Sequence, residues 1–323
     1  MQSNGIKIAL CATSQRIGFA ICQSLERLVQ IESIKVFLDP VNDPVRLMYR
    51  GECLQVETYN SLENYMPDII IYAGKAFNFN AFHSQFNRLN IPMLNLSWGL
   101  GVENLILEPN DENIYQMKHP ITQQLYLPLS HIDKLSKIET VNICVACGAD
   151  IEGEDGILEL MNQTKAYMSY DEEYFNVFPK PIAFNSISDI SVDETTGYDA
   201  CRRMMTKELK QALKNDLSID MSFMQLPVIQ GHHAVVHVTS KNPIDMCEVG
   251  KSFESDPLLH HVNLVSNREY AQCFNRVAIS QIKQHPEHNR GISFHVLADE
   301  LAFGIKQYVL HKVTEMFEIT EAM

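Results

Sequence analysis

The chain has 323 residues, of which 46% are hydrophobic and 20% are charged, and its formal net charge is −14. This composition is typical of a globular protein, and the length exceeds what one hydrophobic core usually serves, so we expect two domains. The negative charge disfavours nucleic acid and anionic membranes as partners, because their phosphates would be repelled. No apolar run approaches the roughly 18 residues of a membrane span, so we expect no membrane segment.

The cysteines and the N-terminus point to the cytoplasm. Most of the eight cysteines fall inside apolar segments and lack the spacing of a disulfide framework. The stretch Met1–Gly5 is polar and leads directly into a strand-like run, unlike a signal peptide. Cys144 and Cys147 form a C-x-x-C pair, but residues i and i+3 of a strand point to opposite faces, so we expect neither metal nor redox chemistry there. We therefore predict a cytoplasmic protein with free thiols.

The first part of the chain alternates between apolar runs and helix-like segments. The strand candidates are Ile6–Thr13, Ser33–Leu38, Asp68–Ala73 and Pro92–Leu96. The helix candidates between them are Ile17–Val29 and Ala76–Leu89. Short β-branched runs that alternate with helices favour a parallel sheet buried on both faces.

The pattern changes after about residue 130. The strand candidates become longer and more alternating: Glu139–Ala149, Ser218–Val228, His233–Thr239, His260–Leu264, Cys273–Gln281 and Gly291–Ala298. Helices are predicted at Asp155–Met168 and Tyr198–Lys214, and a final amphipathic helix at Asp299–Glu318. Such strands with intervening helices indicate a mixed or antiparallel sheet, and hence an α+β second domain.

The first strand is followed by a turn that partly fits a dinucleotide site. Such a site needs a strand, a glycine-rich turn and a helix, because glycines let the backbone approach the pyrophosphate. Here Gly18 alone remains of three glycines, and Cys11 and Ser14 occupy the first two places. Thr13, Ser14, Ile17 and Gly18 would line the cofactor. An ordinary strand-to-helix turn explains the same residues equally well.

An acidic residue follows the second strand candidate. Asp39 stands where a carboxylate usually binds the ribose 2′-hydroxyl and repels a 2′-phosphate, which favours NAD over NADP. A turn aspartate before Pro40 is an equally good explanation.

The most specific segment is residues 225–238, Q-L-P-V-I-Q-G-H-H-A-V-V-H-V. It resembles the pattern R-V-P-V-x-x-G-H-S-x-x-V of the aspartate-semialdehyde dehydrogenase family. In that family the histidine is the acid/base and the arginine holds the substrate carboxylate. The resemblance therefore implies His232 as the acid/base and places Gln225 at the substrate-binding position.

Further segments resemble the same family in the same order along the chain. They are Ala73–Gly74 (A-G-G-S in the family), Cys147–Asp150 with Gly156–Leu160 (S-G-A-G-x-x-G-x-x-E-L), Phe178–Asn185 (F-P-x-P-I-A-F-N) and Leu297–Leu301 with Gly304 (V-A-D-N-L-R-x-G). The resemblance implies that Gly74 and Gly148 lie in cofactor-binding loops.

The resemblance also implies the fold, the assembly and the reaction. We expect an α/β protein with an N-terminal Rossmann-type parallel sheet at 1–130, completed by a C-terminal helix at 299–323. The range 131–298 would form an α+β semialdehyde-dehydrogenase dimerisation domain, and the protein would be a homodimer. In active members a cysteine thiolate attacks the semialdehyde, NADP takes hydride, and phosphate releases the acyl phosphate.

The chain departs from this pattern where the reaction needs it most. The nucleophile should lie in an N-P-N-C-S-T turn, but residues 116–124 read Q-M-K-H-P-I-T-Q-Q, and no cysteine lies between Cys53 and Cys144. Thr122 could occupy the position, but a hydroxyl has a far higher pKa than a thiol. Gln225 carries no charge for a carboxylate, and residues 97–102 (S-W-G-L-G-V) lack the phosphate-binding arginine.

These losses resemble the Usg-type relatives, which are non-catalytic and also lack the cysteine. We therefore predict a homodimeric pseudoenzyme with a binding or regulatory role. Binding of NAD or NADP would be weak or lost, and a small molecule is a possible ligand. One alternative is an active oxidoreductase on a small carbonyl substrate with His232 as acid/base. The other is a true semialdehyde dehydrogenase with Cys147 as a displaced nucleophile. His233 and His237 alternate with His232 along one strand without neighbouring ligands, so we expect no metal site.

Overall fold

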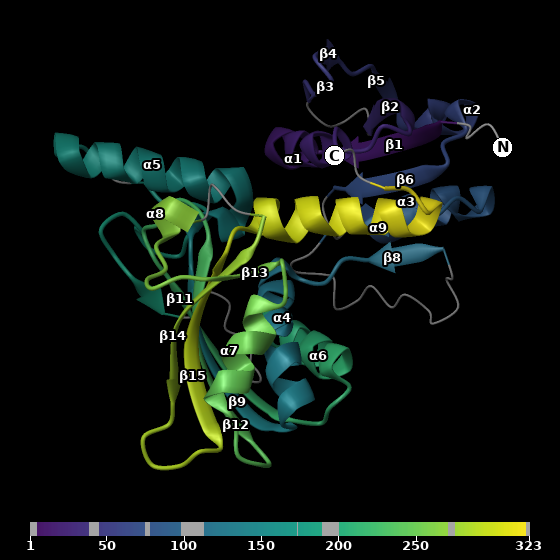
Figure 1. Cartoon of the computed structure of the whole chain (residues 1–323). Coiled ribbons are helices and arrows are strands. Elements are labelled where there is room, and N and C mark those ends of the chain that lie inside the picture. The colour runs from purple at the N-terminus through teal and green to yellow at the C-terminus, as the bar shows by residue number, and fades with distance from the viewer. Residues whose placement is uncertain are drawn as a thin grey trace. The chain divides into compact units, whose positions relative to one another are not determined.

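The computed structural model describes residues 5–38, 45–74, 78–97, 113–172, 174–188, 200–270 and 275–320. The chain divides into two compact units, one of Met1–His119 with Ile305–Met323 and the other of Pro120–Gly304. Each unit is built around its own sheet (Figure 1). In the described ranges, no helix has both the length and the apolar character that crossing a membrane requires.

The first unit contains a parallel sheet of six strands in the order β5-β2-β1-β6-β7-β8. The strands are β1 (Ile6–Ala12), β2 (Ile31–Leu38), β5 (Val56–Thr58), β6 (Ile69–Ala73), β7 (Met93–Asn95) and β8 (Ile114–Gln116). Every residue of the central strand β6 is buried, as a sheet covered on both faces requires. The predicted Rossmann-like parallel sheet is confirmed.

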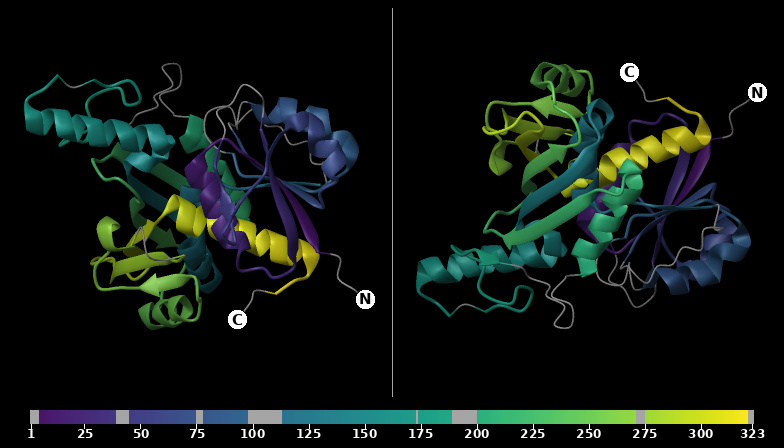
Figure 2. Two further views of the ribbon diagram at one scale, coloured as in Figure 1. Left: turned by 90° about the horizontal axis from the view of Figure 1, so that it is seen from above. Right: turned by 90° about the horizontal axis from the view of Figure 1, so that it is seen from below.

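Helices cover both faces of this sheet. They are α1 (Gln15–Leu25), α2 (Leu62–Tyr65), α3 (Phe79–Phe86) and α9 (Gln307–Phe317), and a short hairpin is formed by β3 (Met48–Tyr49) and β4 (Glu52–Cys53). Helices α1 and α9 contact each other on one side, while α2 and α3 lie on the other (Figure 2). The C-terminal helix thus belongs to the first unit even though it comes last in the sequence.

The second unit contains a mixed sheet of seven strands in the order β10-β11-β9-β12-β15-β14-β13. The strands are β9 (Ile138–Cys147), β10 (Ile187–Ser188), β11 (Ser218–Gln225), β12 (His232–Ser240), β13 (Leu259–His261), β14 (Val277–Gln284) and β15 (Gly291–Ala298). Strand β9 pairs in parallel with β11 and antiparallel with β12, and β15 pairs antiparallel with both β12 and β14. The predicted mixed sheet is confirmed.

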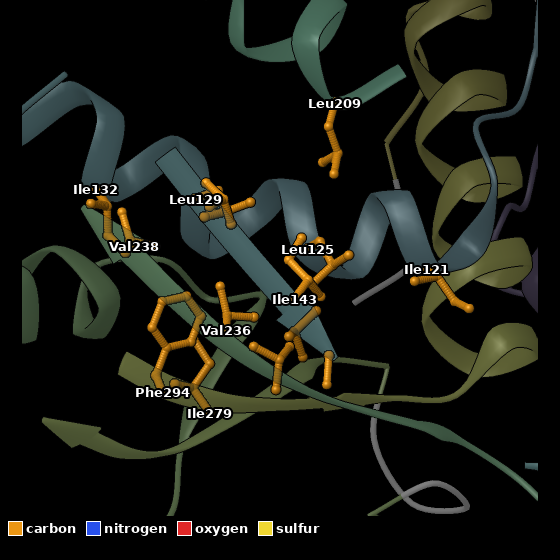
Figure 3. Packing of buried hydrophobic residues seen from close by; sticks show 14 of the residues in the cluster. Ile121, Leu125, Leu129, Ile132, Ile143, Leu209, Val236, Val238, Ile279 and Phe294 are labelled. Atoms are coloured by element: carbon orange, nitrogen blue, oxygen red, sulfur yellow. The ribbon is translucent and has the colours of Figure 1, made fainter. Parts of the chain in front are cut away.

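Helices α4 (Pro120–Leu135), α6 (Ala200–Leu213) and α7 (Met246–Glu254) pack on one face of the second sheet. Figure 3 shows the resulting core, in which Leu125 and Leu129 of α4 meet Ile143, Val236 and Phe294 of the strands. Along β9 the residues on this face are buried, whereas those between them are exposed or half-buried. The remaining helices are α5 (Gly153–Ser169) and α8 (Asn267–Tyr270).

Several elements differ from the sequence-based expectation, which also missed the short strands β3, β4, β5, β8 and β10 and the short helices α2 and α8. Helix α4 was not predicted, because Pro128 and the polar residues before it lack the sequence pattern of a helix, although most of the helix is buried. Helix α7 was also not predicted. The helix expected at Asp299–Glu318 begins instead as a π-helix, η6 (Glu300–Lys306), and continues as α9.

Candidate functional site

The residues predicted to be catalytic lie at one end of the second sheet. Gln225 is the last residue of β11 and His232 is the first residue of β12. The parallel register pairs Gln225 with Cys147, the last residue of β9. All three side chains are buried, and strand alternation places them on the face that the helices cover. The fold therefore brings His232, Gln225 and Cys147 to the same place.

His232 lies between two carboxylates. Its Nδ1 is 4.0 Å from Oδ1 of Asp150, and its Nε2 is 3.6 Å from Oε2 of Glu300. The side chains of His232, Asp150 and Glu300 are 1%, 0% and 6% exposed. Neither ring nitrogen has a partner within hydrogen-bonding distance, although both are buried. One potential ligand atom from each of the three residues lies within 4.8 Å of the other two.

The charges around His232 favour its protonated form. Burial by itself lowers the pKa of an imidazole, because it penalises the charged state. The negative charges of Asp150, Glu300 and Asp299 outweigh this effect, and the pKa of His232 is raised above its usual value. The cluster thus attracts positive charge into the interior of the second unit.

Asp150 is fixed by the turn that follows β9. A Cβ on Gly148 would lie 2.6 Å from Oδ1 of Asp150 and 2.9 Å from the carbonyl oxygen of Gly231, so only glycine leaves room for this carboxylate. Oδ2 of Asp150 accepts a hydrogen bond of 3.0 Å from the amide of Gly231, whose φ of 86° also suits glycine. Gly148, which we predicted in a cofactor loop, therefore shapes the surroundings of His232.

Glu300 and His232 are held by contacts near the ends of β15 and β12. Asp299 caps η6, since its Oδ1 accepts a hydrogen bond of 2.6 Å from the amide three residues later, and Glu300 follows directly. The buried amide of Gln124, in the second turn of α4, donates to the carbonyl oxygens of His232 at 2.8 Å and Val296 at 3.2 Å. One side chain from α4 thus joins the two strands that carry the cluster.

Gln225 cannot bind a substrate carboxylate in this conformation. Its side chain is fully buried, its Nε2 lies 3.5 Å from the carbonyl oxygen of Leu226, and its Oε1 has no hydrogen-bond partner. Arg202 of α6 lies with its guanidinium 5.9 Å from the ring centroid of Phe223, a residue of the same strand as Gln225. Positive charge is therefore present on α6 but not at position 225.

The position expected for the nucleophile is occupied by the first turn of α4. Thr122 lies in this turn, is fully buried, and its hydroxyl has no hydrogen-bond partner. The thiol that the fold does bring to this end of the sheet is Cys147. The register that pairs Ala146 with His233 continues to place Cys147 alongside His232, and the thiol packs in the core of the second unit.

The predicted nucleotide turn forms a capped helix start. Ser14 is the N-cap of α1, and its hydroxyl accepts a hydrogen bond of 3.3 Å from the amide of Ile17. A Cβ on Gly18 would lie 2.6 Å from Cδ1 of Leu47, so the space beside this glycine is filled by the chain itself. The amide of Ile17 and the face of Gly18 are thus already used for packing and capping.

Two more predicted cofactor residues lie at the same edge of the first sheet. Thr13 follows β1, and its amide lies 3.5 Å from the carbonyl oxygen of Ala73. Gly74 follows β6 and lies against the ring of Tyr72. The structure brings Thr13 and Gly74 together with the turn, while Asp39 lies outside the described residues.

Sequence reasoning missed Asp150, Glu300 and Gln124. A signal was present for two of them. Asp150 stands at the second glycine of S-G-A-G, and Glu300 stands at the asparagine of V-A-D-N-L, so both carboxylates replace neutral residues of the pattern that the chain resembles. Gln124 gave no signal, because its partners are main-chain groups of distant strands.

The fold defines the class of the protein. The chain combines a Rossmann-like parallel unit, completed by the C-terminal helix, with a mixed α/β unit inserted in the sequence. Residues 129–303 match the family described as semialdehyde dehydrogenase, dimerisation domain, and the chain belongs to this family.

Curated relatives agree with this assignment. The chain is 25% identical to an aspartate-semialdehyde dehydrogenase of Rickettsia bellii, over 67% of this chain and 63% of that protein. It is 21% identical to a USG-1 protein homolog of Azotobacter vinelandii, over 79% of this chain and 80% of that one. The match to the Rickettsia protein thus covers less than two thirds of that protein's length.

Solved structures share the fold. Aspartate semialdehyde dehydrogenase II of Vibrio cholerae, complexed with ASA, superposes with a TM-score of 0.85 at 18% identity, covering 97% of this chain and 98% of that one. Aspartate semialdehyde dehydrogenase of Candida albicans, solved with NADP, gives a TM-score of 0.68 at 11% identity, covering 98% and 100%.

Proposed function

We propose that this protein uses the semialdehyde dehydrogenase scaffold for a binding or regulatory role and does not catalyse the aspartate-semialdehyde dehydrogenase reaction. The observation that carries the proposal is the state of His232. A histidine that serves as acid/base must exchange protons with a substrate or nucleophile. Here the imidazole is only 1% exposed and lies between two carboxylates that raise its pKa, so neither solvent nor a substrate reaches its ring nitrogens in this conformation.

The nucleophile and the carboxylate-binding charge are also missing. Thiohemiacetal formation needs a thiolate at a helix N-terminus, and the buried hydroxyl of Thr122 in α4 is a poor substitute. Gln225 offers only an uncharged, buried amide. The groups of one catalytic mechanism depend on each other, so removing the nucleophile alone lowers the rate by many orders of magnitude.

The residues of the nucleotide turn do not fit a dinucleotide as family members would hold it. A pyrophosphate needs open amides and a glycine face at the start of the helix. In this turn the hydroxyl of Ser14 already caps the amide of Ile17, and the side chain of Leu47 fills the space beside Gly18. We therefore propose that affinity for NAD and NADP is weak or lost.

The second unit supports a homodimer. The face of its sheet opposite the helices exposes a mixture of polar and apolar side chains, among them Cys144 and His237. Large apolar side chains are exposed on α5 and in the segment after it: Leu158, Met161, Tyr167, Met168, Tyr170, Tyr174, Phe175 and Phe184. Exposed apolar groups of this kind mark interaction surfaces, as expected of a dimerisation domain. Sedimentation should give twice the chain mass, and a monomer at micromolar concentration would contradict the dimer.

One observation favours a second candidate function. Cys147 lies alongside His232 on the same face of the sheet, so a displaced thiol could in principle serve as the nucleophile of a true semialdehyde dehydrogenase. Its burial in the hydrophobic core speaks against this role, because burial in apolar surroundings disfavours the thiolate.

The test is phosphate-dependent reduction of NADP or NAD with aspartate semialdehyde, assayed alongside an active family member. We expect no turnover above the rate without protein, and the same result for Cys147→Ser. Thermal-shift titration with NAD, NADH and NADP at millimolar concentration should give no more than a small shift. Turnover that Cys147→Ser abolishes would establish the second candidate. Turnover that survives Cys147→Ser but is lost in His232→Gln would establish an oxidoreductase without a covalent step.

A further inference from the structure

We propose that Asp150, His232 and Glu300 form a binding site for one divalent first-row transition-metal ion, Zn²⁺ or Mn²⁺. The three residues come from the turn after β9, the start of β12 and the start of η6. Within the described part of the chain, this is the one set of three metal-ligating side chains with its ligand atoms so close together. The proposal is independent of the proposed function, since it concerns binding and not turnover.

The ligand atoms must move closer together to bind one ion. Zn²⁺ binds imidazole nitrogen and carboxylate oxygen at about 2.1 Å in tetrahedral geometry, so two ligand atoms on one ion are about 3.4 Å apart. The candidate ligand atoms lie within 4.8 Å of one another. Closing the site on one ion therefore needs side-chain movements of up to about 1.4 Å.

His232 provides the independent sign that a ligand belongs here. Its ring is 1% exposed, yet both ring nitrogens lack a hydrogen-bond partner, although buried polar groups are nearly always paired. Nδ1 lies 4.0 Å from Asp150 and Nε2 lies 3.6 Å from Glu300, both too far for direct hydrogen bonds, so one of the two nitrogens is available to bind an ion.

Charge favours a divalent ion over a proton. With both carboxylates ionised and the imidazole neutral, the cluster would contain two buried negative charges. Protonation of the imidazole would neutralise only one of them, whereas a divalent cation neutralises both, and uncompensated buried charge is costly.

Neighbouring groups hold the proposed ligands in place. Oδ2 of Asp150 accepts the hydrogen bond from the amide of Gly231, which orients the carboxylate, and Gly148 leaves the space it occupies. Gln124 fixes the main chain of His232 through its carbonyl oxygen. Such outer contacts orient metal ligands and sustain affinity. One imidazole with two carboxylates suits Zn²⁺ or Mn²⁺, whereas Mg²⁺ prefers oxygen ligands and retains its waters.

The experiment measures metal content and stability of the full chain. The protein is stripped with a chelator, incubated with Zn²⁺, Mn²⁺ or Mg²⁺ separately, desalted and analysed by elemental mass spectrometry. We expect about one equivalent of Zn²⁺ or Mn²⁺ per chain and no retained Mg²⁺. At a free-ion concentration 100 times the dissociation constant, the melting temperature should rise by about 4 °C.

The variants Asp150→Asn and Glu300→Gln remove one ligand charge each and nearly preserve shape. Loss of an outer-shell partner weakens metal binding about 10–100-fold, so loss of a ligand should weaken it at least as much. Matched controls are Asp216→Asn, whose side chain is 99% exposed, and His237→Gln, an exposed histidine of the same strand as His232. Both controls should retain the ion.

A measurement on the unaltered chain covers the case in which a variant fails to fold. With Co²⁺ as a visible probe, the ligand-field bands should match one imidazole and oxygen ligands, and Zn²⁺ should displace them. An unaltered chain that retains neither Zn²⁺ nor Mn²⁺ after desalting would overturn the proposal, because His232 would then hold only a proton. Equal retention by well-folded Asp150→Asn and Glu300→Gln would place the ion elsewhere and overturn it as well.

Discussion

The turn after β1 and the cluster around His232 are the two places where the sequence predicted function, and they are stabilised in opposite ways. In the turn, Ser14 caps the amide of Ile17 three residues later, a contact set by local sequence. In the cluster, Asp150, His232 and Glu300 meet from segments far apart in the chain. The first region depends on neighbours in the sequence, while the second depends on how strands distant in the sequence meet. The comparison teaches that local sequence is enough to set a helix start, whereas a buried charged cluster requires the whole fold of its unit.

The largest expected effect comes from breaking the cluster. In metal-free protein, Asp150→Ala removes one of the two carboxylates beside His232 and the acceptor of the Gly231 amide. Removing one member of a buried charged set typically costs about 3–5 kcal/mol of unfolding free energy. Urea unfolding followed by circular dichroism measures the change, and Asp216→Ala is the exposed control. A loss no greater than that of the control would show that the cluster contributes nothing to stability.

A smaller effect is expected in the turn. Ser14→Ala removes the side-chain cap of α1 and should cost about 1 kcal/mol. The matched control is Asn78→Ala, because Asn78 precedes α3 without a side-chain cap bond, and it should cost less. Thermal shifts with NAD and NADP should be the same before and after Ser14→Ala. A cofactor-induced shift that disappears in Ser14→Ala would restore the turn as a nucleotide site.

The smallest effect concerns pH and the opposite face of the second sheet. His233 Nε2 lies 3.0 Å from His295 Nδ1. Burial lowers the pKa of both imidazoles. The charge of His295 lowers the pKa of His233 further, and the charges of Lys283 and His237 do the same for His295. Below a pH of about 6.5 these two histidines bind protons more readily in the unfolded chain than in the folded protein. The free energy of unfolding should therefore fall as the pH drops.

Melting temperatures between pH 7.5 and pH 5 test this expectation. His233→Asn should flatten the acid side of the profile, whereas His237→Asn, at an exposed position of the same strand, should leave more of it. An unchanged slope in His233→Asn would assign the acid sensitivity to other groups.

Much of the fold follows from local patterns. The run Ile69–Ala73 and the alternation along Ile138–Cys147 indicate one strand buried on both faces and one covered on a single face, as observed. Helix α4 was not predicted because burial, and not intrinsic helix propensity, stabilises it. Its interior even contains Pro128. Position 232 could be singled out from the motif around it. Its partners could not, because no periodicity links residues 150 and 300 to it.

The joint made by Asp150, His232 and Glu300 also has a consequence for the order of folding. These residues are brought together only after the strands between them have paired, so their contacts are of high sequence separation and should form late. Contacts that are absent from the transition state act on the unfolding rate and leave the folding rate nearly unchanged. The cluster should therefore slow unfolding of the second unit and lengthen the lifetime of its native state.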